Sequence, residues 1–183
     1  MMSMVGIGVL LAVVLVLLLW AGALYVLSAV AMAKMARKRS FPNPWLAWVP
    51  GANTWLLGSL ADHYDQVRGE KDRGFRWILV GFLIAQAALG SISGVAQGVT
   101  QSNAVIVVAA LAQAVLVIVH TIFQYMVFYR IYKSCTPDHA VWMLILSILS
   151  PTAGVIIMLC IRDKTEGIEE YITAESSAEG EKV

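Results

Sequence analysis

The sequence predicts an all-α integral membrane protein, with three transmembrane helices and two proline-broken helical hairpins that are re-entrant or interfacial. Its composition carries the first part of this prediction. Of the 183 residues, 59% are hydrophobic and 14% charged, against about 45–50% and about 25% in soluble domains. A single core of this size cannot bury such an excess of apolar residues, which excludes a soluble globular domain. The net charge of +1 gives no basic footprint, so no nucleic-acid partner is expected.

Three stretches are long and apolar enough to cross a bilayer, which takes about 20 residues. They are residues 5–33, 77–99 and 104–129. The first is too long for a signal-peptide core and lacks a basic start, so we expect it to be retained. The spans form one helical membrane domain, residues 1–164, and an acidic cytoplasmic tail follows at 165–183. The end of that tail, Ala174–Val183, is expected to be disordered.

Two further apolar stretches, residues 44–62 and 140–162, are interrupted near their middle. Pro50 and Gly51 break the first, and Pro151 and Gly154 break the second. Proline ends or bends a helix, and glycine lets the backbone turn sharply. Each stretch follows a helix that ends in a basic cluster, which suggests a weak internal repeat. We expect both to leave the membrane by the face at which they enter, although 140–162 could instead form a fourth full span, since membrane helices tolerate proline.

The placement of lysine and arginine favours the re-entrant arrangement. Positive residues accumulate on the cytoplasmic side of membrane proteins. With three spans and two returning hairpins, all 13 lysines and arginines fall on one side. If 140–162 spans fully, three of these residues (Arg162, Lys164 and Lys182) change sides, and the two sides carry 10 and 3 basic residues. If 44–62 spans as well, the two sides carry 7 and 6. The predicted topology has the N-terminus outside and the C-terminus in the cytoplasm.

Polar residues inside the predicted spans form a candidate intramembrane site. Gln113, His120 and Gln124 lie along one face of the third span, and Gln86 in the second span could face them. A buried amide or imidazole in hydrocarbon needs a partner. Either these groups hold the helices together by hydrogen bonds, or they line a hydrated path or ligand site. Asn53 joins the candidate site, with local bonding to freed backbone groups as its other role.

Gly90, Gly94 and Gly98 form two overlapping G-x-x-x-G steps in the second span. This spacing lets helix backbones approach closely. We expect packing within the chain, with a second copy as the alternative. Asp62 to Asp65, which include His63, are expected to form a solvated loop with Arg68 and Lys71.

The sequence carries no catalytic pattern. It has no nucleophile elbow, no H-E-x-x-H and no phosphate-binding G-x-x-x-x-G-K. The two cysteines, Cys135 and Cys160, are 25 residues apart, which matches no compact zinc pattern. No enzyme activity, catalytic residue, cofactor or metal site is therefore predicted.

The segment from Asn43 to Asn53, which reads NPWLAWVPGAN, continues through Leu57-Gly58 to Ala61-Asp62. It resembles a signature of uncharacterised small multi-pass bacterial membrane proteins. They also resemble this chain in a late proline-broken segment that ends near Arg162-Asp163. The resemblance implies a bacterial inner-membrane protein and supplies no activity or functional residue.

Two functional hypotheses follow. The first is a non-enzymatic scaffold or accessory subunit that sits in the lipid bilayer with a membrane-protein partner or as a homo-oligomer. The alternative is a small transporter or channel that uses the polar stripe of the second and third spans together with the broken-helix turns.

Overall fold

The structure, a computed structural model, describes residues 4–71, 73–100 and 103–169, and in these residues it contains helices and no strands. Three helices are long and apolar enough to cross a membrane: α1 (Met4–Lys38), α3 (Phe75–Thr100) and α4 (Asn103–Cys135). The shorter elements are η1 (Pro44–Trp48), α2 (Ala52–Val67), η2 (Pro137–His139), α5 (Ala140–Leu149) and α6 (Pro151–Ile161). The predicted disordered end, Ala174–Val183, lies outside the described residues.

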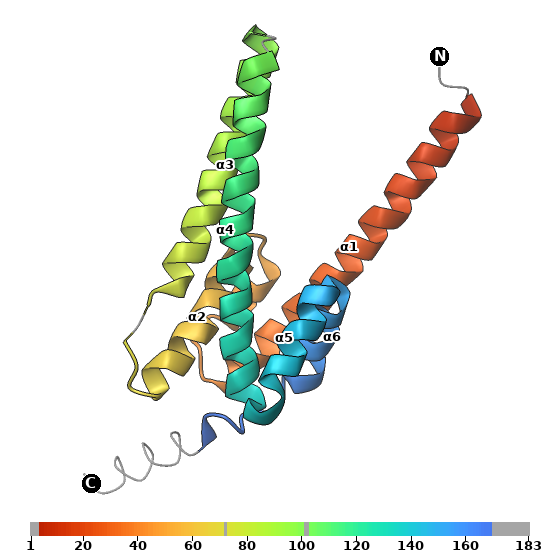
Figure 1. Cartoon of the computed structure of the whole chain (residues 1–183). Coiled ribbons are helices and arrows are strands. Elements are labelled where there is room, and N and C mark those ends of the chain that lie inside the picture. Colours follow the sequence, from red (N-terminus) through yellow and green to blue (C-terminus); the bar gives the residue numbers. More distant parts are fainter. Residues whose placement is uncertain (1–3, 72, 101–102, 170–183) are drawn as a thin grey trace, which may run out of the picture.

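The long helices diverge from a shared base (Figure 1). α3 and α4 form an antiparallel hairpin, whereas α1 leans away from them and packs on η1, α2 and α6. The short helices gather at the base, where α1 and α4 end and α3 begins. We call this the basic end, because it carries the basic residues at the ends of α1 and α4 and at the start of α3.

The long helices run further than the apolar pattern predicted. α1 continues past residue 33 to Lys38, and α4 continues past residue 129 to Cys135. Arg37 and Lys38 lie in the last turn of α1, and Lys133 lies in the last turn of α4. Cations at this position interact favourably with the partial negative charge of a helix C-terminus, which explains the extension into charged sequence.

The first broken stretch forms a hairpin of η1 and α2. Between them Gly51 has a φ of +85°, a left-handed conformation in which a side chain would be strained. The Tyr25 hydroxyl donates a hydrogen bond of 3.0 Å to the Trp48 carbonyl and ties this turn to the middle of α1. α2 then returns to the basic end, where Arg39 bonds the Leu60 carbonyl.

The second broken stretch also doubles back, so residues 140–161 form two short helices instead of a fourth long one. The turn is at Ser150, which is extended (φ −145°, ψ 114°), and Pro151 is the first residue of α6. The expectation that Gly154 makes the turn is wrong. Gly154 lies within α6 and faces α5, where an added Cβ would be 3.2 Å from Ser147 Oγ, so its role is close helix packing.

The core lies in the half of the molecule nearest the basic end. Fully buried side chains there include Met35, Leu60, Phe75, Ile131 and Tyr132. The far halves of α1, α3 and α4 are instead lined with exposed apolar side chains such as Leu18, Ile92 and Val108. This distribution suits a tightly packed base and outer helices in contact with a nonpolar surrounding.

Candidate functional site

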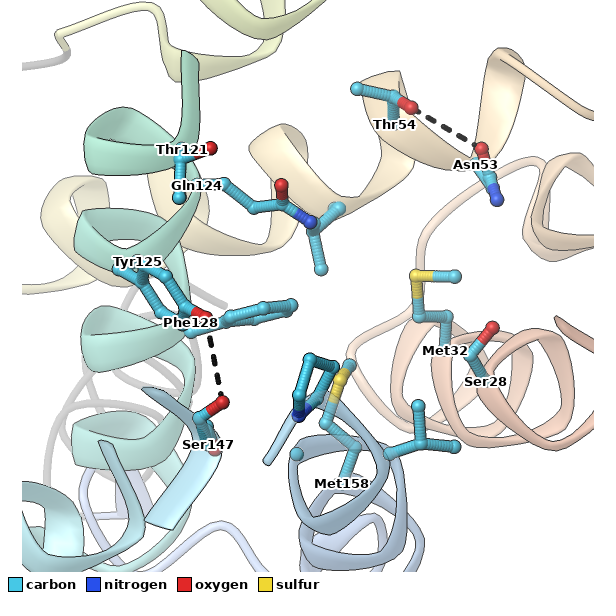
Figure 2. A pocket seen from close by; sticks show the side chains of 14 residues that line it. Ser28, Met32, Asn53, Thr54, Thr121, Gln124, Tyr125, Phe128, Ser147 and Met158 are labelled. Carbon is cyan, nitrogen blue, oxygen red and sulfur yellow. Dashed lines mark hydrogen bonds between the residues drawn. The ribbon is translucent and has the colours of Figure 1, made fainter. Parts of the chain in front are cut away.

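A cavity of about 370 Å³ lies where α1, α2, α4, α5 and α6 meet. Figure 2 shows that the polar side chains of its lining belong to different helices: Ser28 to α1, Asn53 and Thr54 to α2, Gln124 to α4 and Ser147 to α5. The Gln124 side chain extends from α4 into the space between the helices. The volume falls within the range of small-molecule sites, about 300–1,000 Å³.

The cavity brings together two of the predicted polar residues and both broken stretches. Asn53 and Gln124 line it, although 71 positions separate them in the sequence. Pro151 and Gly154 line it from α6. The first turns of α2 and α6 therefore border one space, and the partial positive charge of a helix start favours oxygen acceptors there.

The wall between α4 and α5 is held by Ser147, a residue outside the predicted candidate site. Its hydroxyl lies 2.7 Å from the Tyr132 hydroxyl and donates to the Met143 carbonyl at 2.7 Å. Its own carbonyl accepts a 3.4 Å bond from the Tyr125 hydroxyl. A serine in an apolar helix carries no distinctive sequence signal, and only the fold reveals that three residues converge on it.

The rest of the polar stripe lies elsewhere. Gln86 Nε2 is 2.9 Å from His120 Nδ1, so these two side chains join α3 to α4. Phe82 stacks on the His120 ring at 5.8 Å. Gln113 Oε1 is buried and has no hydrogen-bond partner among the described residues. Gln124 alone of the four stripe residues lines the cavity.

At the basic end, two carboxylates are buried. Asp62 and Asp65 are each 1% exposed and belong to α2. The expectation of a solvated loop is wrong, because each carboxylate has partners on another helix. Asp65 accepts from Arg130 Nε at 3.0 Å, and the Arg130 guanidinium covers the Phe75 ring at 4.4 Å.

Asp62 binds the start of α3. Its carboxylate accepts the backbone N–H groups of Phe75 at 2.7 Å and Arg76 at 3.2 Å. These are among the N–H groups that a helix start cannot satisfy internally. α2 and α3 approach closely beside this contact, since an added Cβ at Gly58 would be 2.5 Å from the Arg76 backbone nitrogen.

Arg39 connects α1 to α4 at the same end. Its guanidinium donates to Ser134 Oγ at 2.6 Å and lies 3.4 Å from the Cys135 sulfur. Burial lowers the pKa of Arg39 from its ordinary value, and the hydrogen bond with Cys135 offsets part of this lowering. The residue is 8% exposed, so this contact works as a buried polar link between helix ends.

The glycine stripe of α3 does not pack against any other part of the chain that the structure describes. A Cβ added at Gly90, Gly94 or Gly98 would meet nothing within 4 Å, and all three are exposed. The expectation of intramolecular packing is wrong, because α4 contacts a different side of α3. The alternative, packing against another chain, stays a prediction.

Among residues 4–71, 73–100 and 103–169, no three histidine, cysteine or acidic side chains lie close enough to share a metal ion. Cys135 is buried and Cys160 exposed, and both are free thiols.

Comparison of the chain with known protein families, with curated proteins and with solved structures finds no match. The resemblance to small bacterial membrane proteins therefore stays a prediction, and the geometry alone supports the proposals below.

Proposed function

We propose that the chain is a multi-pass protein of the bacterial inner membrane, with its N-terminus outside and its basic end in the cytoplasm. The three long apolar helices support insertion. Both broken hairpins begin and end at the basic end, which keeps the lysines and arginines of the described residues on one side. This placement agrees with the accumulation of positive residues on the cytoplasmic side.

Thiol labelling of intact cells with an impermeant maleimide tests this topology. In a chain whose Cys135 and Cys160 are replaced by alanine, Thr165→Cys and Gly69→Cys are expected to react only after the membrane is permeabilised. Asn103→Cys, at the start of α4, is the matched outside position and is expected to react in intact cells. Labelling of Thr165→Cys from the medium would overturn the topology.

Within that membrane we propose a non-enzymatic scaffold or accessory subunit that binds another membrane protein or a second copy. One observation carries this proposal: the glycines on the outer helices have no neighbour among the residues that the structure describes. Gly22 on α1 and both Gly90 and Gly94 on α3 have open space around them. Small residues in a membrane helix allow another backbone to approach closely, so these faces suit an intermolecular contact.

Purification from the native membrane in a mild detergent tests the role. We expect a partner at fixed stoichiometry, or a dimer, that is lost when Gly90 and Gly94 are both replaced by leucine. Ala85→Leu is the matched control, since this residue is exposed on a different face of α3, and it should keep the partner. A monomeric protein with no partner, or equal loss in both variants, contradicts the proposal.

A small transporter is the second candidate, and the cavity favours it. The residues that favour transport, Asn53 and Gln124, face one space beside two helix starts, as discontinuous helices do in transporters. Replacing His120 and Gln124 with leucine, each in its own variant, distinguishes a transport role from a packing role. If the cavity is a transport site, the Gln124 variant loses transport activity with little change in stability. If these side chains only pack the helices, the variants change stability only.

A further inference from the structure

We infer that the cavity binds the polar end of an uncharged membrane lipid, of the diacylglycerol class, from the cytoplasmic leaflet. Four helices that run toward the basic end line the cavity with the same spacing of residues. Each contributes one polar or small residue to a belt on the side of the cavity away from the basic end. These residues are Ser28 on α1, Asn53 on α2, Gln124 on α4 and Gly154 on α6.

Each of these helices contributes an apolar residue four positions later, one turn closer to the basic end. These are Met32, Leu57, Phe128 and Met158. Residues four apart on a helix lie on the same face, so the second set forms a floor beneath the polar belt. Met32, Leu57 and Met158 are each 7% exposed or less. The cavity is therefore closed toward the basic end.

The opposite side of the cavity opens among apolar side chains. Thr121 and Pro151 line the cavity and are exposed, so they mark its mouth. Their neighbours Ile122 and Leu149 are 55% and 82% exposed. Further along α4, the exposed side chains are again apolar, as at Val115. A water-soluble ligand would have to pass this apolar surrounding, whereas a lipid tail can occupy it.

The depth of the cavity fits the linkage region of a lipid. On α1, Ser28 lies six residues before Lys34, and on α4 Gln124 lies six residues before Arg130. At about 1.5 Å per residue, the polar belt is roughly 9 Å inside the layer of basic side chains. In a hydrocarbon core about 30 Å thick this is the cytoplasmic leaflet, just below its headgroups. The tails of a lipid in that leaflet point away from the basic end, between α1 and α4.

The chemistry of the lining selects an uncharged polar end. Among the residues that the structure describes, no lysine, arginine, aspartate, glutamate or histidine lines the cavity, and an ionised phosphate without a partner would be costly at this depth. Amide and hydroxyl groups can donate hydrogen bonds to hydroxyl and ester oxygens, and their own oxygens can accept one from a hydroxyl. A diacylglycerol offers one hydroxyl and two esters. This inference rests on the proposed membrane placement, whose labelling test has a separate readout.

Photocrosslinking of the full chain in phosphatidylcholine nanodiscs tests the inference. The probe is a diacylglycerol with a diazirine close to the ester end of one acyl chain, present as a trace in nanodiscs that hold no other diacylglycerol. We expect crosslinks in residues 121–128 and 151–158. Unlabelled dioleoylglycerol, added at about 10 mol%, should compete, whereas the same amount of dioleoyl phosphatidic acid, or soluble glycerol, should not. Labelling spread evenly over α1 and α3, or equal competition by phosphatidic acid or glycerol, would overturn it.

Variants make the test specific. Gln124→Leu should reduce site labelling about tenfold, the equivalent of one lost hydrogen bond of about 1.4 kcal/mol. Gln113→Leu makes the same change on the same helix outside the cavity, and its labelling should stay within about twofold of the parent chain. Val155→Trp fills the cavity without removing a belt residue and should abolish site labelling. Each variant is compared only after its thermal unfolding matches the parent, and unchanged labelling in both cavity variants refutes the site.

Discussion

The contact between Asp62 and the start of α3 gives the most direct test of how the base is held. Asp62 is 1% exposed and accepts the N–H groups of Phe75 and Arg76 at 2.7 and 3.2 Å. Asp62→Ala removes both acceptors and leaves two donors at a helix start without this partner. Asp62→Asn keeps one carbonyl oxygen and loses the negative charge.

The expected cost follows from these two bonds. A buried donor left unsatisfied costs about 1–3 kcal/mol, and a negative charge at a helix N-terminus contributes about 0.3–1 kcal/mol, up to about 2 when partly buried. For Asp62→Ala we therefore expect a loss of about 3–4 kcal/mol in the free energy of unfolding. For Asp62→Asn, which retains one acceptor, we expect about 1–2 kcal/mol.

Unfolding of the purified chain in mixed micelles, driven by increasing SDS and followed by tryptophan fluorescence, measures these differences. Asp163→Ala is the matched control. Asp163 pairs with a cation, Lys34, but both side chains are about half exposed, so its removal should change stability far less than the removal of Asp62. The reasoning fails if Asp62→Ala is no less stable than Asp163→Ala, or if the asparagine variant loses as much as the alanine variant.

Three further outcomes are expected. Gln86→Leu should cost about 0.6 kcal/mol and at most about 2 in the same assay, because it removes the interhelical bond to His120. Gly58→Ala should cost about 1–3 kcal/mol, since α3 backbone atoms occupy the space of the new methyl group; equal stability would contradict the close approach. Hydrogen bonding from Lys34 lowers the pKa of Asp163, so this contact is complete above the ordinary carboxyl pKa of about 3.9 and is lost as the pH falls through the lowered value. Carboxyl-carbon NMR should show the pKa of Asp163 rising toward about 3.9 in Lys34→Ala.

Apolar length predicted the long helices, because the number of residues needed to cross a bilayer is fixed by its thickness. It did not predict where α1 and α4 end. Both continue into basic sequence, where partners from distant parts of the chain support them: Arg39 bonds Ser134, and Arg130 bonds Asp65. Hydropathy carries no information about such long-range pairs.

The candidate site was predictable only in its parts. Proline and glycine at positions 50 and 51 located one turn, and the rarity of amides in apolar helices located Gln124. The sequence could not show that α1, α2, α4 and α6 run in the same direction around one space. Ser28 and Met32 have the same spacing as Asn53 and Leu57, but this relation acquires meaning only when the helices are neighbours. Asp62 and Asp65 were misassigned for the same reason, since their partners lie on α3 and α4.

The inclination of α1 has a mechanical consequence. From the Tyr25 hydrogen bond down to Lys38 the helix is fastened to the base, whereas from Gly8 to Gly22 its residues are exposed. That unsupported arm is about 21 Å long at about 1.5 Å per residue. A change of about ten degrees in the tilt of this arm would move its tip by about 4 Å. A change of that angle lies within the ordinary variation of transmembrane helix tilt. In the membrane placement proposed above, the spread between α1 and the α3–α4 hairpin can thus follow the thickness and lateral pressure of the bilayer, while the packed base keeps its shape.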